Sequence, residues 1–148
     1  MVLMDVAMTN SGNGPAQVGL IGLGVMGENL ALNIERNGFT IAIYNRTTAK
    51  VDEFIKDRAA GKKVIGCHDA KAFVQSIERP RKIILLVKAG DAVDKTIESI
   101  KPFLDKDDII IDGGNSHFED TRRREKALKQ EGFRLIGSGV SGGHDPGE

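Results

Sequence analysis

The chain has 148 residues, and its 21 Lys and Arg residues balance its 21 Asp and Glu residues, so the formal net charge is zero. This balance gives no electrostatic reason to expect a nucleic acid or a membrane surface as partner. No stretch approaches the ~18–20 apolar residues of a membrane-spanning helix. The single cysteine, Cys67, excludes an internal disulfide and fits a reducing compartment. Three scattered histidines and one cysteine do not predict a metal site.

The first 17 residues contain no Lys or Arg. A secretory signal needs a basic region and a transit peptide needs arginines, so neither is predicted. We expect residues 1–17 to be a disordered lead-in and residues 18–148 to form one domain. The expected location is the cytoplasm, with a plastid or another organelle left open.

The first ordered unit is predicted to be a strand, a turn, a helix and a second strand. Apolar runs at Val18–Ile21 and Phe39–Tyr44 predict the two strands, and Gly38 is expected to end the helix between them. The apolar face of that helix is predicted to contain Met26, Leu30, Ala31, Leu32 and Ile34. This order of elements is the one in which a glycine-rich dinucleotide motif is meaningful.

Gly22, Gly24 and Gly27 have the spacing G-x-G-x-x-G. We expect Gly22 to permit the turn out of the strand, Gly24 to let a pyrophosphate approach the backbone, and Gly27 to let the helix pack closely on the sheet. The N-terminus of the helix would offer free N–H groups to the phosphates. A purely structural turn is the alternative interpretation.

The end of the second strand reads Asn45, Arg46, Thr47 and contains no carboxylate. An NAD site usually has Asp or Glu there, bonded to the ribose 2′-hydroxyl. Arg46 can bind a 2′-phosphate and stack on the adenine, so NADP is the predicted cofactor. The alternatives are that Arg46 is a solvated surface residue and that Thr47 or Thr48 only caps the next helix.

Helices and strands alternate along the rest of the chain. Helices are predicted over residues 48–60, 69–77, 91–104 and 118–131, and strands over 63–67, 82–87, 108–112 and 134–137. This alternation predicts an α/β fold with a doubly wound parallel sheet, a Rossmann-type NADP-binding domain. Ligands of such sheets lie beyond the carboxyl ends of the strands. The loops there are rich in glycine and small polar residues: 22–27, 45–47, 87–90, 112–116 and 138–143.

The segments GLIGLGVMGENLALNIERNGFTIAIYNRT, LLVKAG, IIIDGGNS and GVSGG together resemble the N-terminal domain of the decarboxylating 6-phosphogluconate dehydrogenases, from about Val18 to Gly143. The resemblance implies an NADP-dependent oxidoreductase of the pentose phosphate pathway. Such an enzyme converts 6-phosphogluconate to ribulose 5-phosphate, CO2 and NADPH, and as a whole it is expected to be a homodimer.

The resemblance also implies roles for individual residues. The implied cofactor-binding residues are Gly22, Leu23, Gly24, Val25, Met26, Gly27, Asn45, Arg46, Thr47, Val87, Lys88, Ala89 and Asn115. The implied substrate-binding residues are Asn115, Ser141, Gly142 and Gly143. Alternatives remain: Lys88 as a solvated lysine, Asn115 or Ser116 as caps of the helix that begins near Phe118, and Ser141 as a turn residue.

Residues His144–Glu148 depart from the Glu-Glu-Gly-Ala that usually follows Ser-Gly-Gly in this family. The catalytic lysine and glutamate of the family lie on a later helical domain, so none is assigned here. We therefore expect this chain to bind NADP without turnover. The alternatives are a 3-hydroxyisobutyrate-type dehydrogenase domain that uses NAD, and a non-catalytic NADP-binding module.

Overall fold

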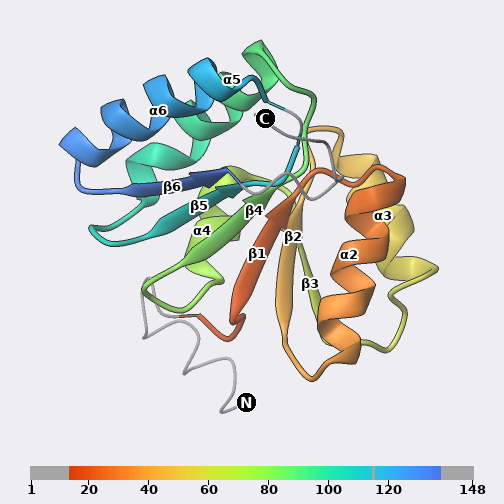
Figure 1. The fold of residues 1–148 in the computed structure, drawn as a ribbon. Coiled ribbons are helices and arrows are strands. Elements are labelled where there is room, and N and C mark those ends of the chain that lie inside the picture. The colour runs from red at the N-terminus through yellow and green to blue at the C-terminus, as the bar shows by residue number, and fades with distance from the viewer. Residues whose placement is uncertain (1–13, 115, 138–148) are drawn as a thin grey trace.

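The computed structural model describes residues 14–114 and 116–137, in which strands and helices alternate (Figure 1). The strands are β1 (Val18–Ile21), β2 (Ile41–Tyr44), β3 (Val64–Cys67), β4 (Lys82–Leu85), β5 (Ile109–Asp112) and β6 (Arg134–Gly137). The helices are α2 (Val25–Arg36), α3 (Thr48–Lys56), α4 (Ala70–Gln75), α5 (Asp91–Ile100) and α6 (Phe118–Gln130). No helix in this part of the chain is both long and apolar enough to cross a bilayer.

The strands form one parallel sheet in the order β3-β2-β1-β4-β5-β6. The chain therefore moves outward from β1 through β2 to β3, and then returns to the other side of β1 with β4. The predicted doubly wound Rossmann-type sheet is confirmed. Its strand order reverses between β1 and β4, and the carboxyl ends of these two strands mark the crevice where such sheets bind ligands.

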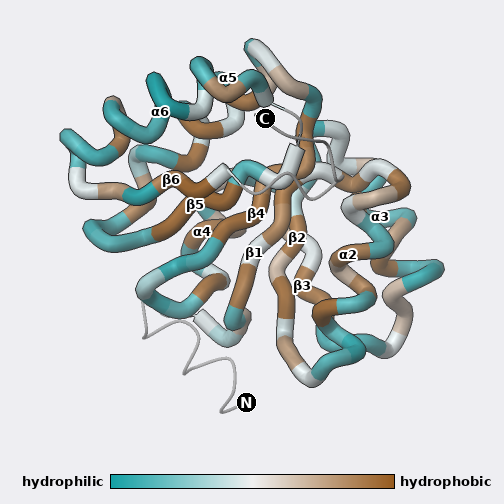
Figure 2. The backbone as a smooth tube through the Cα atoms, in the orientation of Figure 1, coloured by the Kyte–Doolittle hydropathy of each residue, from teal (hydrophilic) through white to brown (hydrophobic). Residues whose placement is uncertain are grey.

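Two hydrophobic clusters cover the two faces of the sheet. One contains buried residues of α2 and α3 together with Leu20, Ile41 and Ile43. The other contains buried residues of α4, α5 and α6, with Ile83 and Leu85. Figure 1 shows α2 and α3 on one side of the sheet and α5 and α6 on the other, and Figure 2 shows hydrophobic residues concentrated in the strands. After the exposed Lys82, strand β4 is apolar, because both of its faces are covered.

The helix ends follow local chemistry. After α2, Gly38 adopts a φ of +98°, as expected of a residue that ends a helix, and the Asp69 carboxylate accepts a hydrogen bond from the Ala72 N–H at 2.7 Å to cap α4. The helix predicted to reach residue 104 becomes a 3-10 turn at Lys101–Phe103. Pro102 lacks the N–H that an α-helical turn requires.

Among the other boundaries that differ from the prediction, two are explained by contacts with the rest of the chain. Helix α3 ends at Lys56 rather than near Ala60, because the Ala59 N–H turns back to the Phe54 carbonyl and the Ala59 side chain enters the core. Residues 14–17, predicted as part of a disordered lead-in, are ordered. Ala16 is fully buried and exchanges backbone hydrogen bonds with Ser76 and Glu78 at 2.9 and 2.8 Å. Residues 1–13 lie outside the described part of the chain.

Candidate functional site

Close packing explains two of the three motif glycines. Gly22 has a φ of +112°, and a Cβ there would overlap the carbonyl oxygen of Leu86, in the loop after β4. A Cβ on Gly27 would overlap the Gly22 carbonyl oxygen, so the first turn of α2 lies directly on the loop. Leu23 between them has its side chain in the core. The predicted roles of Gly22 in the turn and Gly27 in helix packing agree with these contacts.

Gly24 is in a different environment. It is exposed, and a Cβ built on it would meet no atom of the described chain within 4 Å. The next two side chains, Val25 and Met26, are 78% and 43% exposed. Met26 was predicted on the buried face, but Gly27 and Ala31 occupy that position. The beginning of α2 is therefore open on the side where a pyrophosphate is predicted.

Asn45 joins the two loops that follow β1 and β2. Its Oδ1 accepts a hydrogen bond from the Leu23 N–H at 2.8 Å, and its Nδ2 donates to the Thr47 carbonyl at 3.0 Å. The sequence suggested only a direct contact with the cofactor. The structure adds a positioning role, because one amide side chain fixes the glycine-rich turn relative to Arg46 and Thr47.

A cavity of about 350 Å³ lies between the end of β2 and helix α5. It is lined by Ile21, Tyr44, Asn45, Arg46, Thr47, Val87, Ala92, Lys95, Thr96 and Ser99. Arg46 and Lys95 are exposed, and neither makes an ion pair within the described residues. Thr47 precedes α3 without a side-chain capping bond, so its hydroxyl is not used for capping. Among the described residues, two cations and no carboxylate line the cavity.

The residues contributed by α5 were missed in the sequence analysis. Ala92, Lys95, Thr96 and Ser99 recur at helical spacing on the face opposite Val93, Ile97 and Ile100, which are buried. That spacing was visible as the polar face of an amphipathic helix. The spacing alone does not indicate cofactor-binding residues, because the sequence does not show that this face of α5 lies across from the end of β2.

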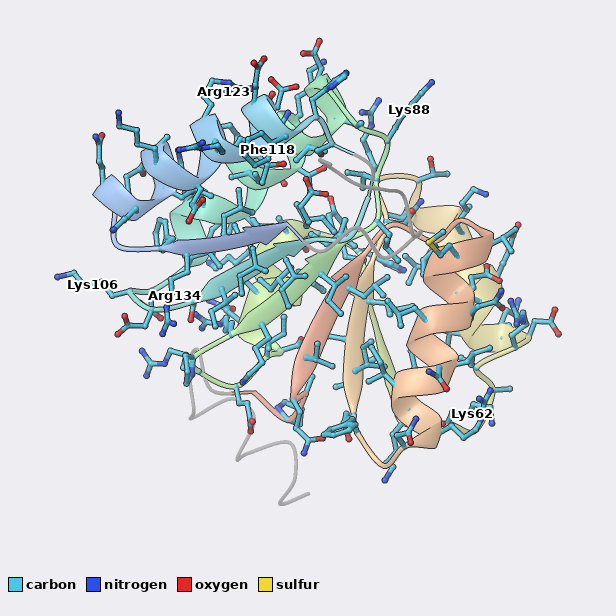
Figure 3. The ribbon with its side chains drawn as sticks, viewed as in Figure 1. Lys62, Lys88, Lys106, Phe118, Arg123 and Arg134 are labelled. Atoms are coloured by element: carbon cyan, nitrogen blue, oxygen red, sulfur yellow. The ribbon has the colours of Figure 1, made fainter. Side chains whose placement is uncertain are left out.

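The loop after β4 lies next to the loop after β5. Lys88 and Ala89 are exposed, and Figure 3 shows Lys88 extending outward from this end of the sheet. A Cβ on Gly114 would lie 3.0 Å from the Val87 carbonyl oxygen, and the Gly113 N–H donates to the Leu85 carbonyl at 2.9 Å. The two loops are therefore packed against each other near the crevice.

Asp112 organises the loop after β5. Its side chain is buried and accepts hydrogen bonds from the Gly114 N–H at 3.1 Å and from the Ser116 hydroxyl at 2.5 Å. The Ser116 hydroxyl therefore does not cap α6, whose N-cap residue is His117. Asn115, Ser141, Gly142 and Gly143 lie outside the described residues, and their roles stay predictions. In the ranges 14–114 and 116–137, no group of three or more His, Cys, Asp or Glu residues is arranged to hold a metal.

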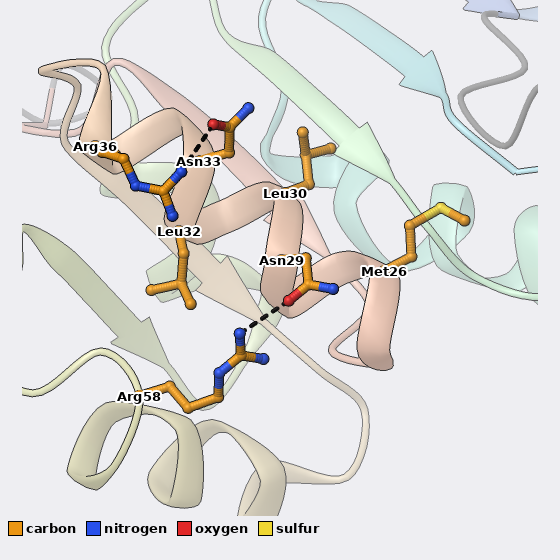
Figure 4. A pocket seen from close by; sticks show the side chains of 7 residues that line it. All are labelled: Met26, Asn29, Leu30, Leu32, Asn33, Arg36 and Arg58. Atoms are coloured by element: carbon orange, nitrogen blue, oxygen red, sulfur yellow. Dashed lines mark hydrogen bonds between the residues drawn. The ribbon is translucent and has the colours of Figure 1, made fainter.

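A second cavity, of about 450 Å³, lies on the outer face of α2 (Figure 4). Arg58, from the segment after α3, donates to Asn29 at 2.8 Å and to Glu28 at 2.9 Å, and Arg36 donates to Asn33 at 3.2 Å. Met26 is the one predicted site residue among its lining residues. Its polar groups bond to one another, so this surface gives no reason to move the predicted cofactor site.

Known proteins are similar to this chain in sequence and in fold. The sequence model described as the NAD binding domain of 6-phosphogluconate dehydrogenase matches residues 17–148. The NADP(+)-dependent, decarboxylating 6-phosphogluconate dehydrogenase of Bacillus subtilis is 56% identical over 129 residues, and the decarboxylating enzyme of Treponema pallidum is 57% identical over 130. These alignments cover 87% and 88% of this chain. The chain spans about a quarter of these relatives, 27% of each.

Solved structures show the same relationship. A 6-phosphogluconate dehydrogenase of Plasmodium falciparum, described in apo form and in complex with NADP+ and with 6-phosphogluconate, matches with a TM-score of 0.74 and 42% identity. The match covers 80% of this chain and 26% of that one. A 3-hydroxyisobutyrate dehydrogenase of Mycobacterium tuberculosis matches with a TM-score of 0.70 at 19% identity, covering 86% of this chain and 41% of its own, which shows the common fold alone. With the glycine-rich turn, the cavity beyond β2 and a family match over residues 17–148, this chain belongs to the family of the NAD binding domain of 6-phosphogluconate dehydrogenase.

Proposed function

We propose that this chain binds NADP along the carboxyl edge of its sheet, as the cofactor domain of a decarboxylating 6-phosphogluconate dehydrogenase. The cavity between β2 and α5 carries the proposal. It has Arg46 on one wall and Lys95 on the other, and none of the described residues that line it is a carboxylate. An NAD site usually has an acid at the end of β2 for the ribose hydroxyl, whereas a 2′-phosphate fits two cations that make no ion pair within the described residues.

The pyrophosphate is assigned to the beginning of α2, within the predicted segment Gly22–Gly27. The first intrahelical hydrogen bond runs from the Glu28 N–H to the Gly24 carbonyl. The amides of Val25, Met26 and Gly27 are therefore free of intrahelical partners and available to phosphate oxygens. The Leu23 N–H already donates to Asn45, so Leu23 contributes through its place in the turn.

The nicotinamide end is assigned to Val87, Lys88 and Ala89, with Asn115 shared between cofactor and substrate. Ser141, Gly142 and Gly143 are proposed to bind 6-phosphogluconate. The complete enzyme would oxidise and decarboxylate this sugar acid to ribulose 5-phosphate while NADP+ becomes NADPH, and we propose that it is a homodimer in the cytoplasm. The Plasmodium relative, described in complex with the same cofactor and substrate, supports this assignment.

We further propose that these 148 residues alone do not turn over substrate. The reaction needs a base within about 2.6–3.2 Å of the substrate hydroxyl and an acid to protonate the product carbon. Lys88 is the one lysine of the five loops, and its proposed place is beside the cofactor. Asp112 is the one acid of these loops, and its two oxygens already accept hydrogen bonds from Gly114 and Ser116.

Calorimetric titration of the chain with NADP and NAD tests cofactor choice. Arg46→Met should weaken NADP binding about 10- to 150-fold, because a charge-assisted hydrogen bond contributes roughly 1.5–3 kcal/mol. NAD binding should change less than about twofold. Arg36→Met is the control, because Arg36 is exposed and bonds only to Asn33 among the described residues. Equal losses for both cofactors would contradict the assignment, and tighter binding of NAD by the unmodified chain would favour the NAD-dependent alternative.

The absence of turnover needs a separate measurement. The chain is mixed with NADP and 6-phosphogluconate, and NADPH is followed by its absorbance. No sustained increase is expected. Continued NADPH formation, in a preparation shown by mass spectrometry to lack longer forms of the enzyme, would mean that the catalytic groups lie within this chain.

A further inference from the structure

A buried arginine on α6 contacts the beginning of α5. Arg124 is only 3% exposed. Its Nε donates to Asp94 Oδ1 at 2.6 Å, and its Nη2 donates to Asp94 Oδ2 at 3.1 Å and to the Gly90 carbonyl at 3.2 Å. The first two bonds form a bidentate ion pair, which fixes the plane of the guanidinium as well as its position.

The Gly90 carbonyl is where the loop after β4 becomes helix α5. Gly90 has a φ of +96°, and its carbonyl also accepts the Val93 N–H at 3.1 Å. Arg124 therefore holds the residue at which the loop changes direction. Lys88 and Ala89 immediately precede this point and are exposed, so the fixed end at Gly90 limits where they can move.

The cost of burying Arg124 argues that the pair does more than fill space. The hydrogen bonds with Asp94 raise the pKa of Arg124 and lower the pKa of Asp94, so both groups are charged at neutral pH. Within the described residues, the buried Nη1 of Arg124 has no hydrogen-bond partner. The Asp94 side chain is 39% exposed, so the cost of burial falls on Arg124, and the unsatisfied buried donor adds to that cost.

We propose that Arg124 is a positioning residue for the nicotinamide end of the cofactor site. By holding Gly90, it keeps Lys88 and Ala89 in the conformation that receives the nicotinamide half, before the cofactor arrives. This role rests on the proposed NADP binding. Arg124 itself contacts α5 and the loop rather than the cofactor, and it is not among the residues that line the 2′-phosphate cavity, to which the loop contributes only Val87.

The binding of two different ligands distinguishes this positioning role from a general structural role of Arg124. NADP occupies both ends of the site, whereas adenosine 2′,5′-bisphosphate carries the 2′-phosphate and lacks the nicotinamide. Arg124→Met should weaken NADP binding about tenfold, because the loop must then be ordered at the moment of binding. Binding of the bisphosphate should change less than about twofold. Equal loss for both ligands, or no loss for NADP, would overturn the proposal.

Arg123→Met is a matched control. Arg123 is the preceding residue, its Nη2 lies 3.6 Å from the same Asp94 carboxylate, and its side chain is 59% exposed. The Arg123→Met substitution removes the same charge, but it breaks no hydrogen bond to Gly90. It should therefore leave the affinities for both ligands unchanged. If Arg124→Met does not fold, Asp94→Asn provides a second variant, because the uncharged amide keeps the shape but weakens the hold on the guanidinium.

A measurement without ligand distinguishes this proposal from the proposed function. Backbone 15N relaxation should give Lys88, Ala89 and Gly90 order parameters near those of α5 in the unmodified chain. The values should fall toward those of flexible segments, below about 0.6, in Arg124→Met or Asp94→Asn but not in Arg123→Met. Unchanged order parameters would refute the positioning role. If the unmodified chain bound no NADP while the loop loosened as expected, the proposed function alone would fail.

Discussion

Asn45→Ala tests whether one side chain holds the two loops of the candidate site together. The substitution removes the hydrogen bond from the Leu23 N–H at 2.8 Å and the bond to the Thr47 carbonyl at 3.0 Å. At about 0.5–1.5 kcal/mol for each bond, the expected loss of stability is roughly 1–3 kcal/mol. For a domain of this size, that loss lowers the melting temperature by about 2–12 °C. Circular dichroism during heating measures the change.

Asn29→Ala is the matched control for this measurement. The Asn29 Oδ1 accepts one exposed bond from Arg58 at 2.8 Å, so its loss should cost no more than about 0.5 kcal/mol. Asn45→Asp keeps an acceptor for the Leu23 N–H but places a carboxylate against the Thr47 carbonyl. It should melt between Asn45→Ala and the unmodified chain and should favour NAD over NADP. A melting temperature of Asn45→Ala equal to that of Asn29→Ala would show that the loops are held by other contacts.

The two remaining predictions concern the glycine-rich turn and acid stability. Gly24→Val should keep the melting temperature, because the new side chain enters open space, but it should abolish NADP binding in calorimetry. Gly27→Ala should instead lose about 1–3 kcal/mol of stability, because its Cβ would overlap the Gly22 carbonyl. Retained affinity in a folded Gly24→Val would place the phosphates elsewhere. Hydrogen bonds from Arg124 and Arg81 lower the pKa values of Asp94 and Asp105, respectively, in the folded chain. Both ionised carboxylates therefore stabilise the folded state at pH values above their unfolded pKa of about 3.9. This stabilisation is lost as the pH falls through the lower pKa values of the folded state. Asp94→Asn and Asp105→Asn should each make stability less dependent on pH below about 4 in acid titrations followed by circular dichroism, and an unchanged dependence would contradict this origin.

Local patterns predicted the fold well. Val18–Ile21 and Arg134–Gly137 have the predicted bounds, and the strand predicted over residues 82–87 is β4. These features depend on neighbours in sequence: hydrophobic periodicity, and a glycine such as Gly38 at a helix end. The glycine-rich turn could also be predicted, because its chemistry lies within six consecutive residues.

Long-range contacts could not be predicted in the same way. Nothing near Arg124 in the sequence indicates a bond to Gly90, and nothing near Asn45 indicates its bond to Leu23. The contribution of Lys95 to the cavity required the sheet order that places α5 beside the end of β2. The short ladder at Ala16 was missed because an isolated pair of bridging residues has no periodic pattern.

The central position of β1 has a consequence for the chain as it is synthesised. Ile21 pairs with Tyr44 on one side and with Leu85 on the other. The second partner lies about 64 residues further along, so the ribosome needs several seconds, at about 5–20 residues per second, before β4 can follow β1. During this interval one edge of an apolar strand has no partner, which is the kind of edge that pairs with other chains. Strand β1, which lies inside the finished sheet, is thus the strand that remains longest without its second neighbour, β4.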